Sequence, residues 1–202
     1  MRYPLAGEGV FRTLQGEGAL LGLPMVFVRL AGCSVGCPGC DTDYGVRERA
    51  TADEIADRVG RLTYRGREWV WITGGEPTDH DLAPLLSALR RHAFPRIAVA
   101  TAGIRPIRAG WVHGGVDFLS VSPHREQGWV QRSGDQINLV PGLNGLTWEE
   151  AGRIAEQADW FAHRWITPCE GDPEAMSRCV QWVHTHPGWR LGIQAHKHWR
   201  LP

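Results

Sequence analysis

The sequence predicts an α/β fold in which strands and helices alternate around a mostly parallel sheet. Short runs rich in β-branched and aromatic residues recur along the 202 residues, and helical patterns lie between several of them. Two of the helix starts carry a capping box, in which a hydroxyl side chain is followed three residues later by a glutamate. A chain of this length can bury one core, so we expect a single domain over residues 1–202.

The predicted strands are short runs of apolar, β-branched and aromatic residues. In chain order they are Met25–Leu30, Trp69–Ile72, Arg96–Thr101, Val116–Val121, Gln136–Val140, Phe161–Ile166 and Trp189–Gln194. The expected helices begin near Thr51, at Asp79 or Asp81, near Thr147 and at Asp172. The last of these has proline at its first helical position and runs toward His184. The stretch between Val121 and Gln136 shows no clear period and is predicted to be a loop rather than a domain boundary.

The composition argues against several classes of partner. Lysine plus arginine total 22 and aspartate plus glutamate total 22, so no strong net field attracts a polyanion such as nucleic acid. No apolar run approaches the roughly 20 residues of a membrane span, and the first ten residues lack the order of a secretion signal. We therefore expect a cytoplasmic protein with neither nucleic acid nor membrane as a partner.

Three of the five cysteines, Cys33, Cys37 and Cys40, lie within eight residues of each other. In a reducing compartment such a cluster is typical of a metal site rather than of disulfides. Three thiolates leave one iron of a 4Fe-4S cluster open, and S-adenosylmethionine (SAM) can occupy that iron. The alternatives are a structural zinc site or an electron-transfer cluster, whose fourth ligand would come from Cys169, Cys179 or a histidine.

The chemically informative segments follow predicted strands. Cys33–Asp41 comes after the first strand, Gly74–Pro77 after the second and Ser122–His124 after the fourth. Because ligands of parallel sheets usually gather at the carboxyl ends of the strands, we expect these segments to meet at one edge of one sheet.

Further motifs surround the cysteines, and together they are more specific than the cysteines alone. They are Leu14–Gly18, Val26–Leu30, Cys40–Thr42, Thr73–Pro77, Ser122–Pro123, Trp189–Gln194 and His196–Lys197. With them the chain resembles, over nearly its whole length, the 7-carboxy-7-deazaguanine synthase family of the radical SAM superfamily. The resemblance implies a partial TIM-type βα barrel in a short single-domain version.

The resemblance also implies an activity. Members contract the ring of 6-carboxy-5,6,7,8-tetrahydropterin to 7-carboxy-7-deazaguanine with loss of ammonia, a step toward queuosine-type deazapurines. The implied cofactors are a 4Fe-4S cluster, SAM and Mg²⁺, and the cluster's electron would cleave SAM to a 5′-deoxyadenosyl radical. The implied partners are an external electron donor, such as flavodoxin or ferredoxin, and a second copy of the chain in a homodimer.

Site residues follow from the matching positions. The resemblance assigns the cluster to Cys33, Cys37 and Cys40, Mg²⁺ to Thr42, and SAM to Gly39, Asp41, Gly74, Gly75, Glu76, Ser122, His124, Thr167 and Glu170. It assigns the substrate to Leu14, Gln15, Gly16, Glu17, Arg29, Thr73 and the terminal carboxylate of Pro202. The planar donors of Arg29 suit a carboxylate or a pterin edge, and the amide of Gln15 both donates and accepts. Arg29 could instead pair with Glu17, and Thr42 could make a local turn hydrogen bond.

This sequence departs from the family pattern at Gly39, His124, Thr167 and Ala195. Histidine titrates near neutral pH whereas the lysine usual at position 124 does not, so SAM contacts there are expected to depend on pH. Two other functions remain open at this stage. One is a different radical SAM enzyme, such as a glycyl-radical activating enzyme, and the other is a non-catalytic iron-sulfur or zinc protein.

Overall fold

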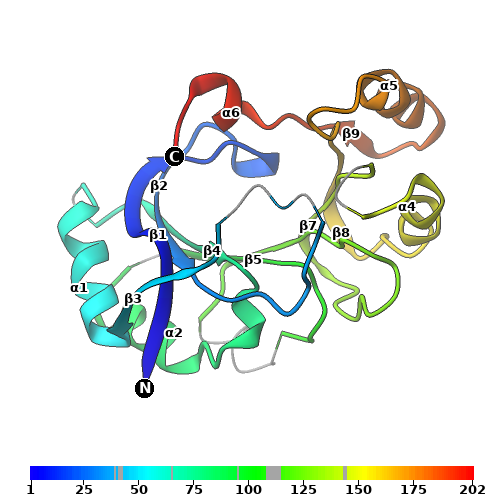
Figure 1. Cartoon of the computed structure of the whole chain (residues 1–202). Helices are drawn as coiled ribbons and strands as arrows, with labels where there is room; N and C mark the ends of the chain where they lie inside the picture. The colour runs from blue at the N-terminus through cyan, green and yellow to red at the C-terminus, as the bar shows by residue number, and fades with distance from the viewer. Residues whose placement is uncertain (39, 41–42, 65, 95, 108–114, 143–144) are drawn as a thin grey trace.

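The computed structural model describes residues 1–38, 40, 43–64, 66–94, 96–107, 115–142 and 145–202. Within these ranges nine strands form one sheet in the order β3-β1-β2-β4-β5-β6-β7-β8-β9 (Figure 1). The strands are β1 (Arg2–Leu14), β2 (Pro24–Leu30), β3 (Val46–Thr51), β4 (Trp69–Gly74), β5 (Ile97–Thr101), β6 (Phe118–Val121), β7 (Gly134–Leu139), β8 (Phe161–Ile166) and β9 (Trp189–Leu191). The helices are α1 (Ala52–Leu62), α2 (Ala83–Arg91), α4 (Trp148–Ala155), α5 (Ala175–Thr185) and α6 (Ala195–Trp199), with short 3₁₀ turns η1 (Gly18–Leu20) and η2 (Pro77–Asp79).

The sheet is a parallel array with an antiparallel edge. From β2 through β9, apart from β3, each strand runs parallel to its neighbour, whereas β1 runs antiparallel to both β2 and β3. Within the described residues β3 and β9 lie at opposite ends of the order and do not pair with each other, so the sheet is open. The predicted α/β class and partial βα barrel are confirmed. In the same ranges, no helix has both the length and the apolar character needed to cross a membrane.

Two apolar clusters lie on opposite faces of the curved sheet. The larger one packs α1, α2, α4 and α5 against the outer face (Figure 1). The smaller one lies inside the curve and contains Met25, Trp71, Ala98 and Phe118. Because side chains alternate along a strand, the positions that follow these residues at intervals of two also face the interior. The inner face therefore carries apolar residues at one end and leads to the cavity described below.

Two helix starts agree with the sequence and two required correction. Thr51 and Thr147 both form the capping boxes predicted for them. The helix predicted to begin at Asp172 begins instead at Ala175, because the Asp172 carboxylate accepts a hydrogen bond at 3.0 Å from the amide of Glu174 and holds a turn.

The helix α2 begins two residues after Asp81, one of its two predicted starts. Asp81 Oδ1 accepts a hydrogen bond at 3.1 Å from the amide of Ala83. Asp79, the other candidate, ends η2 and binds Ser34 instead. The side chain of Asp79 therefore binds the cysteine loop and does not cap a helix.

All seven predicted strands are present with ends shifted by a few residues, and residues 122–133 form the predicted loop. The strands β1 and β3 were not predicted. In β1, Gly7 and Gly9 have positive φ, and the register with β2 shifts between Leu5 and Val10. This bulge interrupts the alternation of apolar and polar residues on which a strand prediction depends.

Candidate active site

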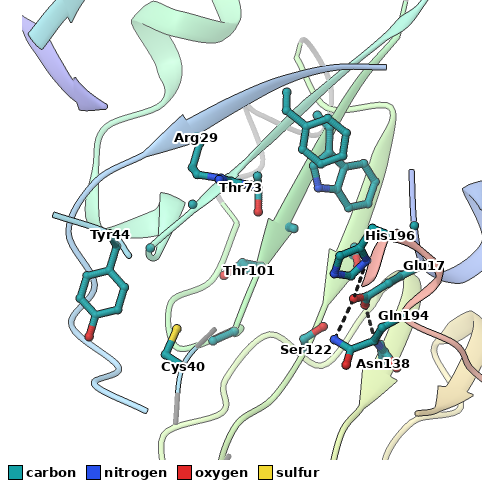
Figure 2. A pocket seen from close by; sticks show the side chains of 18 of the residues that line it. Glu17, Arg29, Cys40, Tyr44, Thr73, Thr101, Ser122, Asn138, Gln194 and His196 are labelled. Atoms are coloured by element: carbon teal, nitrogen blue, oxygen red, sulfur yellow. Dashed lines mark hydrogen bonds and ion pairs between the residues drawn. The ribbon is translucent and has the colours of Figure 1, made fainter. Parts of the chain in front are cut away.

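A cavity of about 590 Å³ opens at the carboxyl ends of the parallel strands. Its walls come from the inner face of β2, β4, β5, β6 and β7, from the cysteine loop and from both ends of the chain (Figure 2). Phe27 and Trp71 are apolar members of the lining, and Arg29 and Thr73 follow them two residues further along the same strands. The predicted meeting of the cysteine loop, the Gly74–Pro77 turn and Ser122 at one sheet edge is confirmed.

Cys33, Cys37 and Cys40 all line this cavity. Cys33 and Cys37 are half-buried and Cys40 is exposed. Burial raises the pKa of the Cys37 thiol, and the neighbouring charges of Cys33 and Cys40 raise it further. A Cys37 thiol whose ionisation is disfavoured in this way fits a site where a bound metal group supplies the positive charge.

The donor set has the composition that a 4Fe-4S cluster with one open iron requires. The three cysteines lie on one loop and line one cavity. In such a cluster each thiolate binds a different iron, so the three sulfurs need not converge on one point. A structural zinc site would need a fourth ligand in addition.

Asp79 anchors the loop that carries the cysteines. Its carboxylate accepts hydrogen bonds at 2.7 Å from both the amide and the hydroxyl of Ser34, and Arg105 pairs with it. Burial raises the pKa of Asp79, but the Ser34 hydrogen bonds and Arg105 outweigh it and lower the pKa overall. The carboxylate is therefore held in its charged form next to Cys33.

Gly74 and Gly75 allow the turn after β4 to lie directly against the cysteine loop. A Cβ atom on Gly75 would stand 1.8 Å from the carbonyl oxygen of Gly32, and one on Gly74 would stand 2.0 Å from that of Leu30. The close approach lets the amide of Gly75 donate to Leu30 O at 2.9 Å and that of Glu76 donate to Gly32 O at 3.0 Å. The two glycines thus fix the cysteine loop to the sheet.

Glu76 is 1% exposed, and both of its carboxylate oxygens accept hydrogen bonds from other residues of the chain. Oε1 accepts from the amide of Thr78 at 2.9 Å, from its hydroxyl at 2.7 Å and from the Thr101 hydroxyl at 2.6 Å. Oε2 accepts from the amide of Ala102 at 2.8 Å. In the described structure this side chain ties η2 to the end of β5, and its predicted contact with SAM remains a prediction.

Arg29 and Thr73 are register partners at the ends of β2 and β4. Figure 2 shows the Arg29 side chain directed toward Thr73 inside the cavity. The guanidinium carbon lies 4.7 Å from the centre of the Phe11 ring. A cation stacked on a ring holds its planar edge in a fixed direction, which suits recognition of a carboxylate.

Gln15 carries a buried donor. Its side chain is 5% exposed and Oε1 accepts from the amide of Glu17 at 3.1 Å. Among the described residues, Nε2 has no hydrogen-bond partner. A buried unpaired donor is costly, so this atom fits a cavity that receives a ligand with an acceptor group.

Glu17 is the centre of a cluster that joins both ends of the chain (Figure 2). Asn138 Nδ2 donates to its Oε2 at 3.1 Å, Gln194 Nε2 donates to its Oε1 at 3.1 Å, and His196 Nδ1 lies 3.8 Å from Oε1. The backbone supports this arrangement, because the amide of Ala195 donates to the carbonyl of Gly16 at 2.9 Å. The cluster places a carboxylate with fixed orientation on the cavity wall.

Most of the predicted site residues meet in this cavity. Those that line it are Leu14, Gln15, Gly16, Glu17, Arg29, Cys33, Cys37, Cys40, Thr73, Gly74, Gly75, Glu76, Ser122, His124 and Pro202. Thr167 and Glu170 are not among the lining residues: Thr167 is buried, and Glu170 is exposed with an ion pair to Lys197 at 2.9 Å. Gly39, Asp41 and Thr42 lie outside the described residues.

The sequence interpretation did not assign site roles to Asn138, Gln194 and His196, which contact Glu17. Two signals pointed to them. Asn138 lies two residues after Gln136 on the inner face of β7, and both line the cavity. Gln194 and His196 belong to motifs that marked the resemblance but were given no role.

Comparison with known proteins places the chain in a family. Residues 27–124 match the model of the radical SAM superfamily. A 7-carboxy-7-deazaguanine synthase of Nitratidesulfovibrio vulgaris is 32% identical over 220 aligned residues, which cover 96% of this chain and 97% of the relative. This chain belongs to the 7-carboxy-7-deazaguanine synthase family. The resemblance inferred from the motifs is thereby confirmed.

Alignments with other members of the 7-carboxy-7-deazaguanine synthase family also cover nearly the whole of both chains. The synthase of Escherichia coli K12 is 31% identical, with 98% of both chains covered. The crystal structure of QueE from Escherichia coli superposes with a TM-score of 0.76 at 26% identity and covers 97% of this chain and 95% of that one. Membership of a radical SAM family implies a 4Fe-4S cluster and SAM as cofactors, and the cysteine loop described above fits them.

Proposed function

We propose that this protein is a 7-carboxy-7-deazaguanine synthase that contracts the ring of 6-carboxy-5,6,7,8-tetrahydropterin with loss of ammonia. The observation that carries the proposal is that Arg29, Gln15 and Glu17 face the same cavity as the three cysteines. A cavity of about 590 Å³ lies within the range of roughly 300–1,000 Å³ typical of small-molecule sites. Family membership at 32% identity over nearly the whole chain supports the same activity.

The lining residues offer complementary groups for a carboxylated pterin. The Arg29 guanidinium suits the substrate carboxylate, since its planar donors match a carboxylate in a bidentate way. The buried Nε2 of Gln15 suits a carbonyl or ring-nitrogen acceptor. The Glu17 carboxylate suits the N–H edge of the pterin, which resembles a guanidine. Phe27 and Trp71 line the cavity with apolar surface that excludes water from the ring.

Cys33, Cys37 and Cys40 would hold the cluster, and the turn at Gly74 and Gly75 would lie beside SAM. When bound, the cluster and SAM supply the radical chemistry that removes a hydrogen atom from the substrate. The chain contributes position and charge: it holds the substrate between Arg29 and Glu17 and keeps the cysteine loop fixed to β4.

The finer assignments belong to the same proposal. They are a Mg²⁺ site at Thr42, SAM contacts at Gly39, Asp41, Ser122 and His124, and a substrate contact from the terminal carboxylate of Pro202. An external electron donor and a homodimer are likewise proposed from the family resemblance. A single domain over residues 1–202 is proposed from the chain length, and a cytoplasmic location from the composition of the sequence. An oxygen-sensitive cluster suits a reducing compartment.

The test is anaerobic turnover. The reconstituted enzyme is incubated with SAM, Mg²⁺, a reductant and the carboxylated tetrahydropterin, and the product is identified by mass. We expect 7-carboxy-7-deazaguanine from the natural sequence and neither iron nor product from Cys37→Ala. SAM cleavage without conversion of the pterin would indicate a different radical SAM enzyme. Absence of SAM cleavage by an iron-loaded protein would indicate a non-catalytic carrier.

A further inference from the structure

Thr167 lies behind the substrate-facing wall of the cavity. Its side chain is 2% exposed, and its hydroxyl donates at 2.7 Å to Oδ1 of Asn138, which is itself 4% exposed. Asn138 in turn donates through Nδ2 to Oε2 of Glu17 at 3.1 Å. A chain of hydrogen bonds therefore runs from Thr167, just after β8, through Asn138 on β7 to a carboxylate on the cavity wall. Figure 2 shows its last step, between Asn138 and Glu17.

This chain of hydrogen bonds has one consistent direction. An ionised carboxylate only accepts, so Asn138 must turn its NH₂ group toward Glu17. The amide oxygen of Asn138 then faces Thr167, and the threonine hydroxyl must donate to it. Without a donor at position 167, the buried Oδ1 of Asn138 would lose its partner, and only the hydrogen bond to Glu17 would hold the amide in this orientation. The hydroxyl of Thr167 thus reinforces the amide orientation that Glu17 requires.

The Thr167 hydroxyl packs closely against the backbone at Gly192. A Cβ atom on Gly192 would stand 2.0 Å from Thr167 Oγ1, so any other residue at position 192 would displace the threonine side chain. The amide of Gly192 donates to Ile166 O at 2.8 Å, and that of Thr167 donates to Leu139 O at 2.8 Å. The side chain is therefore held between β7 and the segment that leads to Gln194.

We propose that Thr167 is a positioning residue for the substrate: through Asn138 it fixes the Glu17 carboxylate that accepts the N–H edge of the pterin. The inference rests on the proposed function, and it assigns Thr167 to the substrate side of the site rather than to SAM. Gln194 Nε2 donates to the other oxygen of Glu17 at 3.1 Å, so a side-chain amide contacts each oxygen, and His196 Nδ1 lies 3.8 Å from Oε1. A carboxylate held by these contacts presents its oxygens to the substrate in a fixed direction.

The test compares Thr167→Val, which keeps the shape and removes the donor, with Thr167→Ser, which keeps the hydroxyl. In Thr167→Val we expect the KM for the pterin to rise about tenfold, as loss of one well-placed hydrogen bond implies, with kcat and the KM for SAM changed less than about twofold. Thr167→Ser should stay within about twofold of the natural enzyme. Thr63→Val, just after α1 and outside the lining of the cavity, is the matched control: it removes a hydroxyl that donates to Gly60 O at 3.2 Å and should change neither constant.

Two further measurements separate positioning from general damage. Asn138→Ala removes the next residue in the chain of hydrogen bonds and should raise the KM for the pterin in the same way. It replaces Thr167→Val in the test if that variant is too unstable to purify. In the Glu17→Gln background, Thr167→Val should add less than about a further twofold, because the residue acts through Glu17. A rise in the KM for SAM alone, or equal effects in both backgrounds, would overturn the inference while leaving the proposed function intact. Failure of the natural enzyme to convert the pterin would overturn both.

Discussion

The Glu76 carboxylate provides the sharpest test of how the site is held together. It is 1% exposed and accepts four hydrogen bonds, three on Oε1 and one on Oε2. Two of the donors are backbone amides, of Thr78 and Ala102, which have no side-chain freedom to find another acceptor. The substitution Glu76→Gln keeps the size of the side chain and changes one oxygen into an NH₂ group.

The expected cost follows from this geometry. The glutamine oxygen would face the three donors around Oε1, which places its NH₂ group against the amide of Ala102. An amide left without an acceptor in a buried site costs about 1–3 kcal/mol. The other three donors lose a charged acceptor, whose hydrogen bonds are roughly twice as strong as those of a neutral one. We therefore expect a loss of about 2–4 kcal/mol from a total stability of order 5–15 kcal/mol.

Anaerobic urea unfolding, followed by tryptophan fluorescence, measures this loss. With a slope of about 1–3 kcal/mol per molar urea, the midpoint should fall by roughly 1 M or more while the slope stays unchanged. Glu156→Gln, an exposed position on the outer surface, is the matched control and should leave the midpoint in place. Equal midpoints for Glu76→Gln and the natural protein would refute the structural role and favour a Glu76 that serves the cofactor alone.

Three other perturbations address the cysteine loop and the chain end. Gly75→Ala should prevent stable iron loading, measured by iron content, because its Cβ would stand 1.8 Å from the Gly32 carbonyl oxygen. Asp79→Asn should speed cluster loss in air, followed by the decay of visible absorbance, because it weakens the two hydrogen bonds that hold Ser34; an unchanged decay would argue against an anchoring role. Extending the chain beyond Pro202 should raise the dissociation constant for the pterin severalfold, and equal binding would remove the terminal carboxylate from the site.

The parts of the fold that the sequence predicted correctly depend on local signals. The capping boxes at Thr51 and Thr147 are complete within four residues, and the parallel strands are short apolar runs with clear ends. The Asp172 prediction failed because a proline after an acidic residue is compatible both with a helix start and with a turn before one. The strand β1 was missed because its bulge and glycines depend on pairing with two partners.

The contacts of Glu17 could not be predicted from local sequence patterns. Its partners Asn138 and Gln194 are 121 and 177 residues away in the chain. Their proximity depends on β7 lying inside the sheet and on the last residues returning to the loop at Gly16. Thr167 illustrates the same limit, because matching its position to the family could not show that its side chain is buried against Asn138.

Two glutamates near the cavity show why residue type alone does not assign a role. Glu76 and Glu17 both line it and both accept hydrogen bonds from their own chain. The donors of Glu76 include two backbone amides fixed by the fold, and almost none of its surface reaches the cavity. Glu17 is held by two side-chain amides and keeps 28% of its side chain exposed. A carboxylate that the backbone encloses stabilises the site, whereas one oriented by side chains at the surface of the cavity is placed to bind what enters it.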